Sequence, residues 1–165
     1  DHALKFQFSK LYSIELFTPI FDMAAKKYFK INNLELINEA SVYGLLSIMQ
    51  KSCLERPILF WLDAHFPGAD YKYTDYAGEI NSDIRIPLQT ELELIKTNRF
   101  NNRDVIIIDD LRIYEDGPFQ AGNWEDRCTL GGNGVEFIYS LFDTTHTIDR
   151  DFRDQGYLLL LPRLV

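Results

Sequence analysis

The sequence predicts an α/β fold of the Rossmann-like, doubly wound type, with a mostly parallel sheet and a C-terminal antiparallel hairpin. Three observations support this fold class. Short apolar runs alternate with amphipathic helical patterns, two of these runs are almost continuously apolar, and the last two are joined by the short connection Asp154-Gln155-Gly156. With 165 residues, of which 46% are hydrophobic, the chain is expected to form a single domain over residues 1–165.

The individual elements follow from these patterns in chain order. Strands are expected where apolar residues run or alternate, and helices where they recur every three or four positions. The predicted strands cover residues 11–16, 34–37, 58–62, 105–108, 145–152 and 157–161. The predicted helices run from Thr18 to the break at Asn32-Asn33, over 42–52, onward from Pro87, and over 134–142.

Some residues indicate boundaries and environments. Thr18, which is followed by proline, is typical of a helix N-cap, and Ser41 can cap the next helix. The run 58–62 is nearly continuous in apolar residues, so we expect a central parallel strand that is covered on both faces. The polar stretches 66–86 and 115–134 are long loops, a type of segment that often carries function.

Charge and composition exclude several classes of partner. The net charge is −8 and there is no long run of Lys or Arg, which disfavours binding to nucleic acid or to an anionic membrane surface. The apolar runs are much shorter than the roughly 20 residues that span a bilayer. Cys53 and Cys128 are interpreted as reduced thiols, and no signal-peptide pattern is seen at the start, so a cytoplasmic protein is expected.

Acidic residues lie at or just after the end of each predicted parallel strand. Glu15, Glu39, Asp63 and Asp109 occupy these positions, and Asp110 comes directly after Asp109. Ligands of open parallel sheets bind beyond the carboxyl ends of the strands, so we expect these side chains to meet at one edge. Glu39 and Asp110, taken alone, can equally be capping or turn residues.

At these strand ends the sequence resembles a known family, the class I S-adenosylmethionine-dependent methyltransferases. The hairpin ending in residues 156–161 fits as well, because the last strand of that family inserts antiparallel. The likeness extends over residues 11–162 and is greatest to bacterial methyltransferase-like proteins of glycan or secondary-metabolite pathways. The segments that carry it, in order and spacing, are 12–16, 36–41, 60–65 and 106–110.

The resemblance implies roles for particular positions. A carboxylate at Glu15 would accept hydrogen bonds from both ribose hydroxyls of the cofactor. Asp63 would face the methionine end of the cofactor and the methyl acceptor. Residues 1–10 contain no glycine, so the family's first strand and glycine-rich loop are expected upstream of Asp1, the alternative being that the loop is lost. The positions that the resemblance places beside the cofactor are Glu15, Leu16, Glu39, Ala40, Ser41 and Asp63.

Metal and proton-transfer roles are assigned to the same edge. Asp63, Asp109 and Asp110 would repel one another unless a cation neutralised them, and oxygen ligands suit Mg²⁺. The alternative is that Arg112 pairs with one of these aspartates and no metal binds. His65 and Asp63 are the candidate catalytic residues, with His65 as general base because imidazole titrates near neutral pH. A structural role for His65 stays open.

The function predicted from the sequence is methyl transfer from S-adenosylmethionine to a hydroxyl of a small molecule or glycan, with Mg²⁺ as an optional second cofactor. Two alternatives share the same architecture. One is a non-catalytic Rossmann-like module for binding or assembly. The other is a metal-dependent sugar-nucleotide transferase that uses Asp63 and Asp109. The sequence leaves self-association of the chain open.

Overall fold

The computed structural model describes residues 3–51, 56–64, 85–99, 103–124 and 134–163. Contacts between residues divide the chain into two compact units, Asp1–Gln50 and Lys51–Val165. Each unit is described by itself below, as unit 1 and unit 2. Both units combine helices with strands, so the α/β class is confirmed.

Unit 1 is built on a pair of parallel strands. β1 (Leu11–Glu15) and β2 (Leu34–Asn38) run in register from Leu11 opposite Leu34 to Glu15 opposite Asn38. α2 (Ser41–Met49) has an apolar buried side, whereas α1 (Thr18–Tyr28) has no buried residue. A short 3-10 helix, η1 (Ala3–Lys5), precedes β1.

The two helices of unit 1 begin one residue earlier than predicted, at the residues that were expected to be their caps. Phe17 and Ala40 occupy the cap positions, so Thr18 and Ser41 are the first helical residues. The backbone N–H of Phe17, at the cap position of α1, donates to Glu15 Oε1 at 2.8 Å. Because the Thr18 hydroxyl donates to Asn38 Oδ1 at 2.9 Å, it ties α1 to β2 rather than capping its own helix.

Unit 2 contains a four-stranded sheet in the order β3-β4-β6-β5. β3 and β4 are parallel, and β6 is antiparallel to both of its neighbours, β4 and β5. The predicted terminal hairpin is therefore confirmed, and the sheet is mixed. Its strands and helices are β3 (Leu59–Leu62), α5 (Leu88–Arg99), β4 (Val105–Ile108), η3 (Leu111–Ile113), α6 (Glu136–Phe142), β5 (His146–Asp151) and β6 (Tyr157–Pro162).

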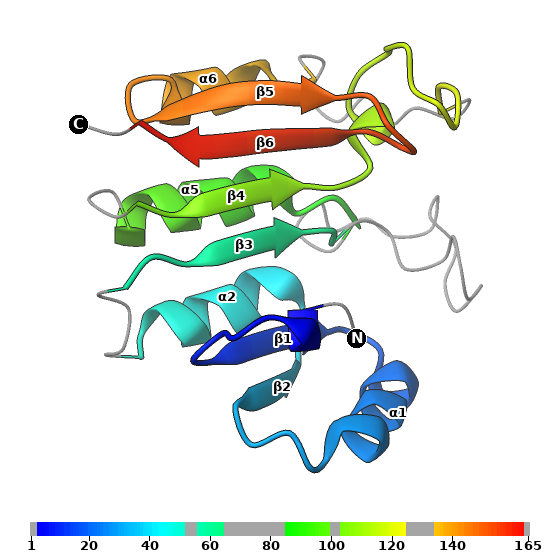
Figure 1. The fold of residues 1–165 in the computed structure, drawn as a ribbon, viewed down its shortest axis with the longest axis vertical. Helices are drawn as coiled ribbons and strands as arrows, with labels where there is room; N and C mark the ends of the chain where they lie inside the picture. Colours follow the sequence, from blue (N-terminus) through cyan, green and yellow to red (C-terminus); the bar gives the residue numbers. More distant parts are fainter. Residues whose placement is uncertain (1–2, 52–55, 65–84, 100–102, 125–133, 164–165) are drawn as a thin grey trace. The chain divides into compact units, whose positions relative to one another are not determined.

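The core of unit 2 lies on one face of this sheet. Phe60 of β3, Ile106 of β4 and Leu160 of β6 are adjacent in the register and buried. α5 and α6 cover this face, as Figure 1 shows, and contribute fully buried residues such as Leu92 and Ile138. Each buried Leu or Ile stabilises the fold by roughly 1.5–3 kcal/mol.

The opposite face of the sheet differs from the prediction. β3 was expected to be covered on both faces, but Leu59 and Trp61 are 44% and 53% exposed. The prediction was wrong because α5 and α6, the described helices next to β4 in sequence, both pack on the same side of the sheet. The apolar run of β3 is thus half core and half surface.

The hairpin turn requires its glycine. Asp154 and Gly156 both have positive φ values, 53° and 87°. A Cβ atom on Gly156 would lie 2.3 Å from the ring of Phe119 and 3.2 Å from Leu111 Cβ. The Gly156 carbonyl accepts the N–H of Leu111 at 2.9 Å. The turn is therefore packed directly against the segment that follows β4.

Candidate functional site

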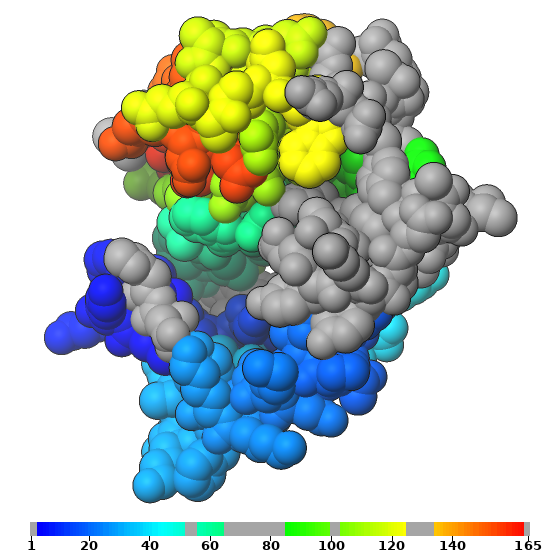
Figure 2. All heavy atoms as spheres, turned by 90° about the vertical axis from the view of Figure 1, so that its right-hand side faces the viewer, coloured from blue at the N-terminus to red at the C-terminus, as the bar shows by residue number. Residues whose placement is uncertain are grey.

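Two carboxylates lie side by side at the carboxyl edge of the unit 2 sheet. Leu62 of β3 pairs with Ile108 of β4, so the next residues, Asp63 and Asp109, are neighbours just beyond the ends of the two strands. The N–H of Asp109 donates to the Leu62 carbonyl at 2.9 Å, which extends the pairing by one step. Asp63 is exposed and Asp109 is half-buried. Figure 2 faces this edge of the molecule.

Asp110 has a different environment from its neighbours. It is buried and adopts the left-handed conformation, with φ 50° and ψ 47°, at the start of η3. Its N–H donates to Asp109 Oδ1 at 2.8 Å. Aspartate tolerates this backbone conformation better than most residues, although it remains costly. Asp110 thus shapes the turn that presents Asp109.

An aromatic pair that the sequence analysis did not identify lies at the same edge. The rings of Trp61 and Tyr157 contact edge-on with centroids 6.1 Å apart. Burial raises the pKa of the Tyr157 hydroxyl, and the negative charges of nearby aspartates, Asp109 first, raise it further. Because β6 runs antiparallel to β4, its first residue lies where β4 ends. The hairpin pattern in the sequence could therefore have placed Tyr157 at this edge.

The described residues offer no ready metal site. Among them, no group of three or more His, Cys, Asp or Glu side chains is arranged to hold a metal ion. Asp63, Asp109 and Asp110 therefore do not form a complete ligand set. Arg112, the alternative partner for these aspartates, instead donates to Gln155 Oε1 and lies over the Trp124 ring at 5.1 Å.

Unit 1 carries its own pair of carboxylates at strand ends. Glu15 ends β1 and Glu39 follows β2, and the N–H of Glu39 donates to the Glu15 carbonyl at 3.1 Å. Glu15 uses Oε1 to accept the Phe17 N–H, as described above. Leu16 and Glu39 are exposed, whereas Ala40 is buried. Glu15 and Glu39 are thus adjacent within unit 1, whereas Asp63 and Asp109 belong to unit 2.

Some predicted positions lie outside the described residues. They include His65, the proposed general base. Phe119 and Trp124, the described aromatics of the 115–134 loop, pack on the protein. Phe119 is buried against Phe152, with ring centroids 5.3 Å apart. Cys53 and Cys128, the two predicted thiols, also lie outside the described residues.

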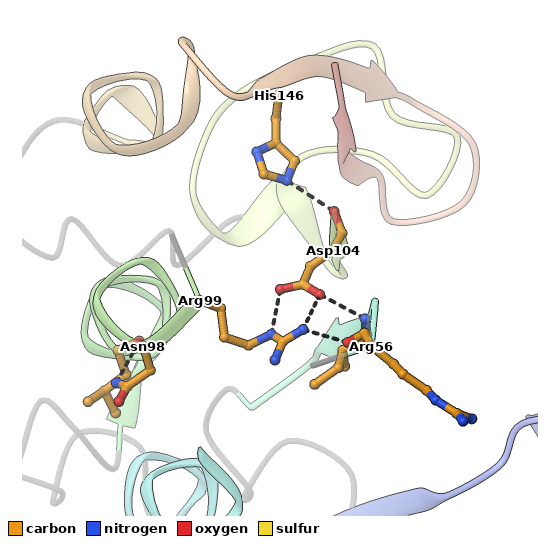
Figure 3. A network of polar contacts seen from close by, with 7 residues as sticks. Arg56, Asn98, Arg99, Asp104 and His146 are labelled. Carbon is orange, nitrogen blue, oxygen red and sulfur yellow. Dashed lines mark hydrogen bonds and ion pairs between the residues drawn. The ribbon is translucent and has the colours of Figure 1, made fainter. Parts of the chain in front are cut away.

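A buried ion pair holds the opposite, amino-terminal ends of β3 and β4 (Figure 3). Arg99 Nε and Nη2 donate to the two carboxylate oxygens of Asp104 at 2.6 and 2.7 Å, and the two side chains are only 1% and 3% exposed. Asp104 Oδ1 also accepts the Ile58 N–H at 2.7 Å, and Arg99 donates to the Arg56 carbonyl. The pair thereby joins α5 to the chain that enters β3.

His146 extends this network to β5. Its Nε2 lies 3.0 Å from the Asp104 carbonyl oxygen, which can only accept, so Nε2 carries a proton. Its Nδ1 lies 2.9 Å from the Thr145 hydroxyl. Burial lowers the pKa of His146 below its usual value, and Lys96 acts in the same direction. The folded protein therefore favours the neutral form of the His146 imidazole.

Comparison with known proteins identifies no family for the chain. A scan against protein-family models finds no match, and a search of curated proteins finds none either. Among the described helices, none is long and apolar enough to cross a membrane.

Proposed function

We propose that this chain is a methyltransferase domain that uses S-adenosylmethionine to methylate a hydroxyl group of a small molecule or sugar. The observation that carries the proposal is the placement of carboxylates at the ends of adjacent parallel strands. Glu15 and Glu39 hold such positions in unit 1, and Asp63 and Asp109 in unit 2. Ligands of open parallel sheets bind beyond these ends.

The strand order of unit 2 is further support. β6 is inserted between β4 and β5 and runs against both. This is the arrangement that the resemblance to class I methyltransferases implies for the end of the sheet. The Rossmann-like interpretation of the whole chain rests on the same likeness, because fold alone does not define chemistry.

The donor and acceptor chemistry of the described residues fits the cofactor. A carboxylate can accept about four hydrogen bonds, so Glu15 can accept ribose hydroxyls while it binds the Phe17 N–H. The exposed carboxylate of Asp63 suits a cationic amino group. When bound, the cofactor supplies an activated methyl group. The residues of the chain hold and orient it, and His65 is assigned to take the acceptor's proton.

Calorimetric titration of the full chain with S-adenosylmethionine and S-adenosylhomocysteine tests this proposal. We expect Glu15→Ala to weaken both affinities by about tenfold or more, which corresponds to roughly 1.4 kcal/mol. Glu35→Ala is the matched control, because Glu35 pairs with Lys10 on the surface of the same unit. Equal affinities in the two variants would contradict the proposal. Binding of a nucleotide sugar instead would favour the sugar-nucleotide transferase.

A role for Mg²⁺ is a separate part of the proposal. Asp63 and Asp109 would supply two oxygens, and the acceptor and water would supply the rest, as is usual for Mg²⁺. We expect Asp109→Asn to abolish any effect of Mg²⁺ on the titration. If a chelator changes the wild type and this variant equally, Asp109 is not a ligand.

A further inference from the structure

The side chain of Asn38 holds the connection between β1 and α1 in unit 1. Asn38 is the last residue of β2 and lies opposite Glu15, the last residue of β1. Its Nδ2 donates to the carbonyl oxygens of Glu15 at 2.8 Å and of Leu16 at 3.1 Å, and its Oδ1 accepts the Thr18 hydroxyl at 2.9 Å. Asn38 thus binds three of the four residues from Glu15 to Thr18.

The hydrogen-bonding groups of asparagine match these three partners. An amide side chain offers two N–H donors and one carbonyl acceptor. The two backbone carbonyls can only accept, so the nitrogen of the amide faces them and its oxygen faces the Thr18 hydroxyl. An aspartate would have no donor for the carbonyls, and it would add a negative charge beside Glu15 and Glu39. Position 38 therefore suits asparagine in particular.

The same connection fixes the carboxylate of Glu15. Its Oε1 accepts the Phe17 N–H at 2.8 Å, and Phe17 lies between Leu16 and Thr18, the two residues that Asn38 holds. This bond uses one lone pair of the carboxylate and leaves the others for hydroxyl groups of a ligand. Because the direction of the Phe17 N–H depends on the backbone of residues 15–18, losing the bonds of Asn38 would also release the carboxylate.

We propose that Asn38 is a positioning residue, which orders the connection from β1 to α1 so that the Glu15 carboxylate accepts both hydroxyls of a ribose. The inference rests on the proposed function, in which Glu15 binds the ribose of the cofactor. Asn38 acts through Glu15 rather than through a bond of its own to the ligand, because both N–H groups of its amide are engaged. Asn38 thereby determines the preference of the site for ribose over deoxyribose.

Order in the free protein is the reason that Asn38 affects binding. A connection that is already ordered avoids the loss of conformational entropy that would otherwise oppose binding. A carboxylate that is held in one direction can accept two neighbouring hydroxyls at once, whereas a mobile one pairs with them less often. Asn38 itself is exposed, so its replacement removes hydrogen bonds without emptying any part of the core.

Calorimetric titration of the full chain with S-adenosylhomocysteine and with its 2′-deoxyribose analogue tests the inference. We expect the wild type to bind S-adenosylhomocysteine about tenfold more tightly, because the analogue lacks one of the two hydroxyls. Asn38→Ala should weaken S-adenosylhomocysteine about fivefold and reduce the preference for ribose to about twofold. Asn33→Ala is the matched control, because Asn33 precedes the other end of β2 and donates to the Phe8 carbonyl at 2.9 Å. This control should leave both quantities unchanged.

Combination with Glu15→Ala separates positioning from support of the fold. If Asn38 acts through the carboxylate, Asn38→Ala should change the affinity of the Glu15→Ala protein by less than about twofold. Thr18→Val removes the hydroxyl that binds Asn38 Oδ1 and should also reduce the preference for ribose. Thr18→Ser keeps that hydroxyl and should retain the preference. Circular dichroism checks that each variant is folded.

Two results would overturn the role of Asn38 while the proposed function stands, provided that Glu15→Ala still weakens binding. One is an unchanged preference for ribose in Asn38→Ala. The other is an equal loss of affinity on Asn38→Ala with and without the Glu15 carboxylate. If Asn38→Ala does not fold, the same two criteria apply to Thr18→Val. Absence of binding to the wild type would overturn the proposed function and this inference together.

Discussion

Removing the guanidinium of Arg99 is the sharpest test of the packing in unit 2. Arg99→Met deletes both bonds to Asp104, at 2.6 and 2.7 Å, and the bond to the Arg56 carbonyl. It leaves a carboxylate that is 3% exposed with the Ile58 N–H as a remaining donor. Breaking a buried pair in this way typically costs about 3–5 kcal/mol, and we expect a loss in that range.

The assay is urea unfolding at neutral pH, followed by the fluorescence of Trp61 and Trp124. Both tryptophans belong to unit 2, so the signal reports the unit that contains the ion pair. Arg153→Met is the control, because Arg153 is 77% exposed in its pair with Asp151 and the pair is screened by water. This control should leave the midpoint nearly unchanged.

A double variant separates the lost charge partner from lost packing. In Arg99→Met with Asp104→Asn, the amide oxygen still accepts the Ile58 N–H and no charge is buried. We expect it to recover a large part of the loss, because neutral replacements of buried pairs are often tolerated. A loss in Arg99→Met below about 1 kcal/mol, the range of exposed pairs, would refute the buried position of Arg99 and Asp104.

Two further predictions concern unit 2. Gly156→Ala should lower the free energy of unfolding by about 2–4 kcal/mol, because it combines a positive φ with a Cβ placed 2.3 Å from Phe119. Urea unfolding measures this loss. A loss below about 0.5 kcal/mol would contradict the turn geometry. His146 should make stability fall as the pH drops below its usual pKa of 6.5, because the unfolded chain then binds a proton that the folded chain resists. The measurement is unfolding at about pH 7.5 and about pH 5.5; His146→Gln should show the smaller drop, and an equal drop in both proteins would remove His146 as the cause.

Much of the element order was predictable because local patterns determine it. The run Val105–Ile108 is a strand with the predicted bounds, and the hairpin is confirmed at Asp151 opposite Tyr157. α1 begins at Thr18 itself, and the Thr18 hydroxyl donates to Asn38 Oδ1 on β2 rather than capping its own helix. Such a partner, 20 residues away along the chain, is not contained in the residue types around the helix start.

Features that depend on distant pairs were not predictable. His146 carried little signal in the sequence, yet it contacts the carbonyl of Asp104, 42 residues away. The apolar sequence of β3 did not reveal that α5 and α6 would share one side of the sheet and leave Trp61 exposed. At the candidate site, the position of Asp63 beside Asp109 followed from strand order, whereas the burial of Asp110 depended on its left-handed backbone.

Titration of the full chain with S-adenosylhomocysteine, comparing wild type, Glu15→Ala and Asp63→Ala, tests the proposed function most directly. The account predicts one bound ligand per chain in the wild type and an affinity about tenfold weaker in each variant. Absence of binding to the wild type, or wild-type affinity in both variants, would contradict it.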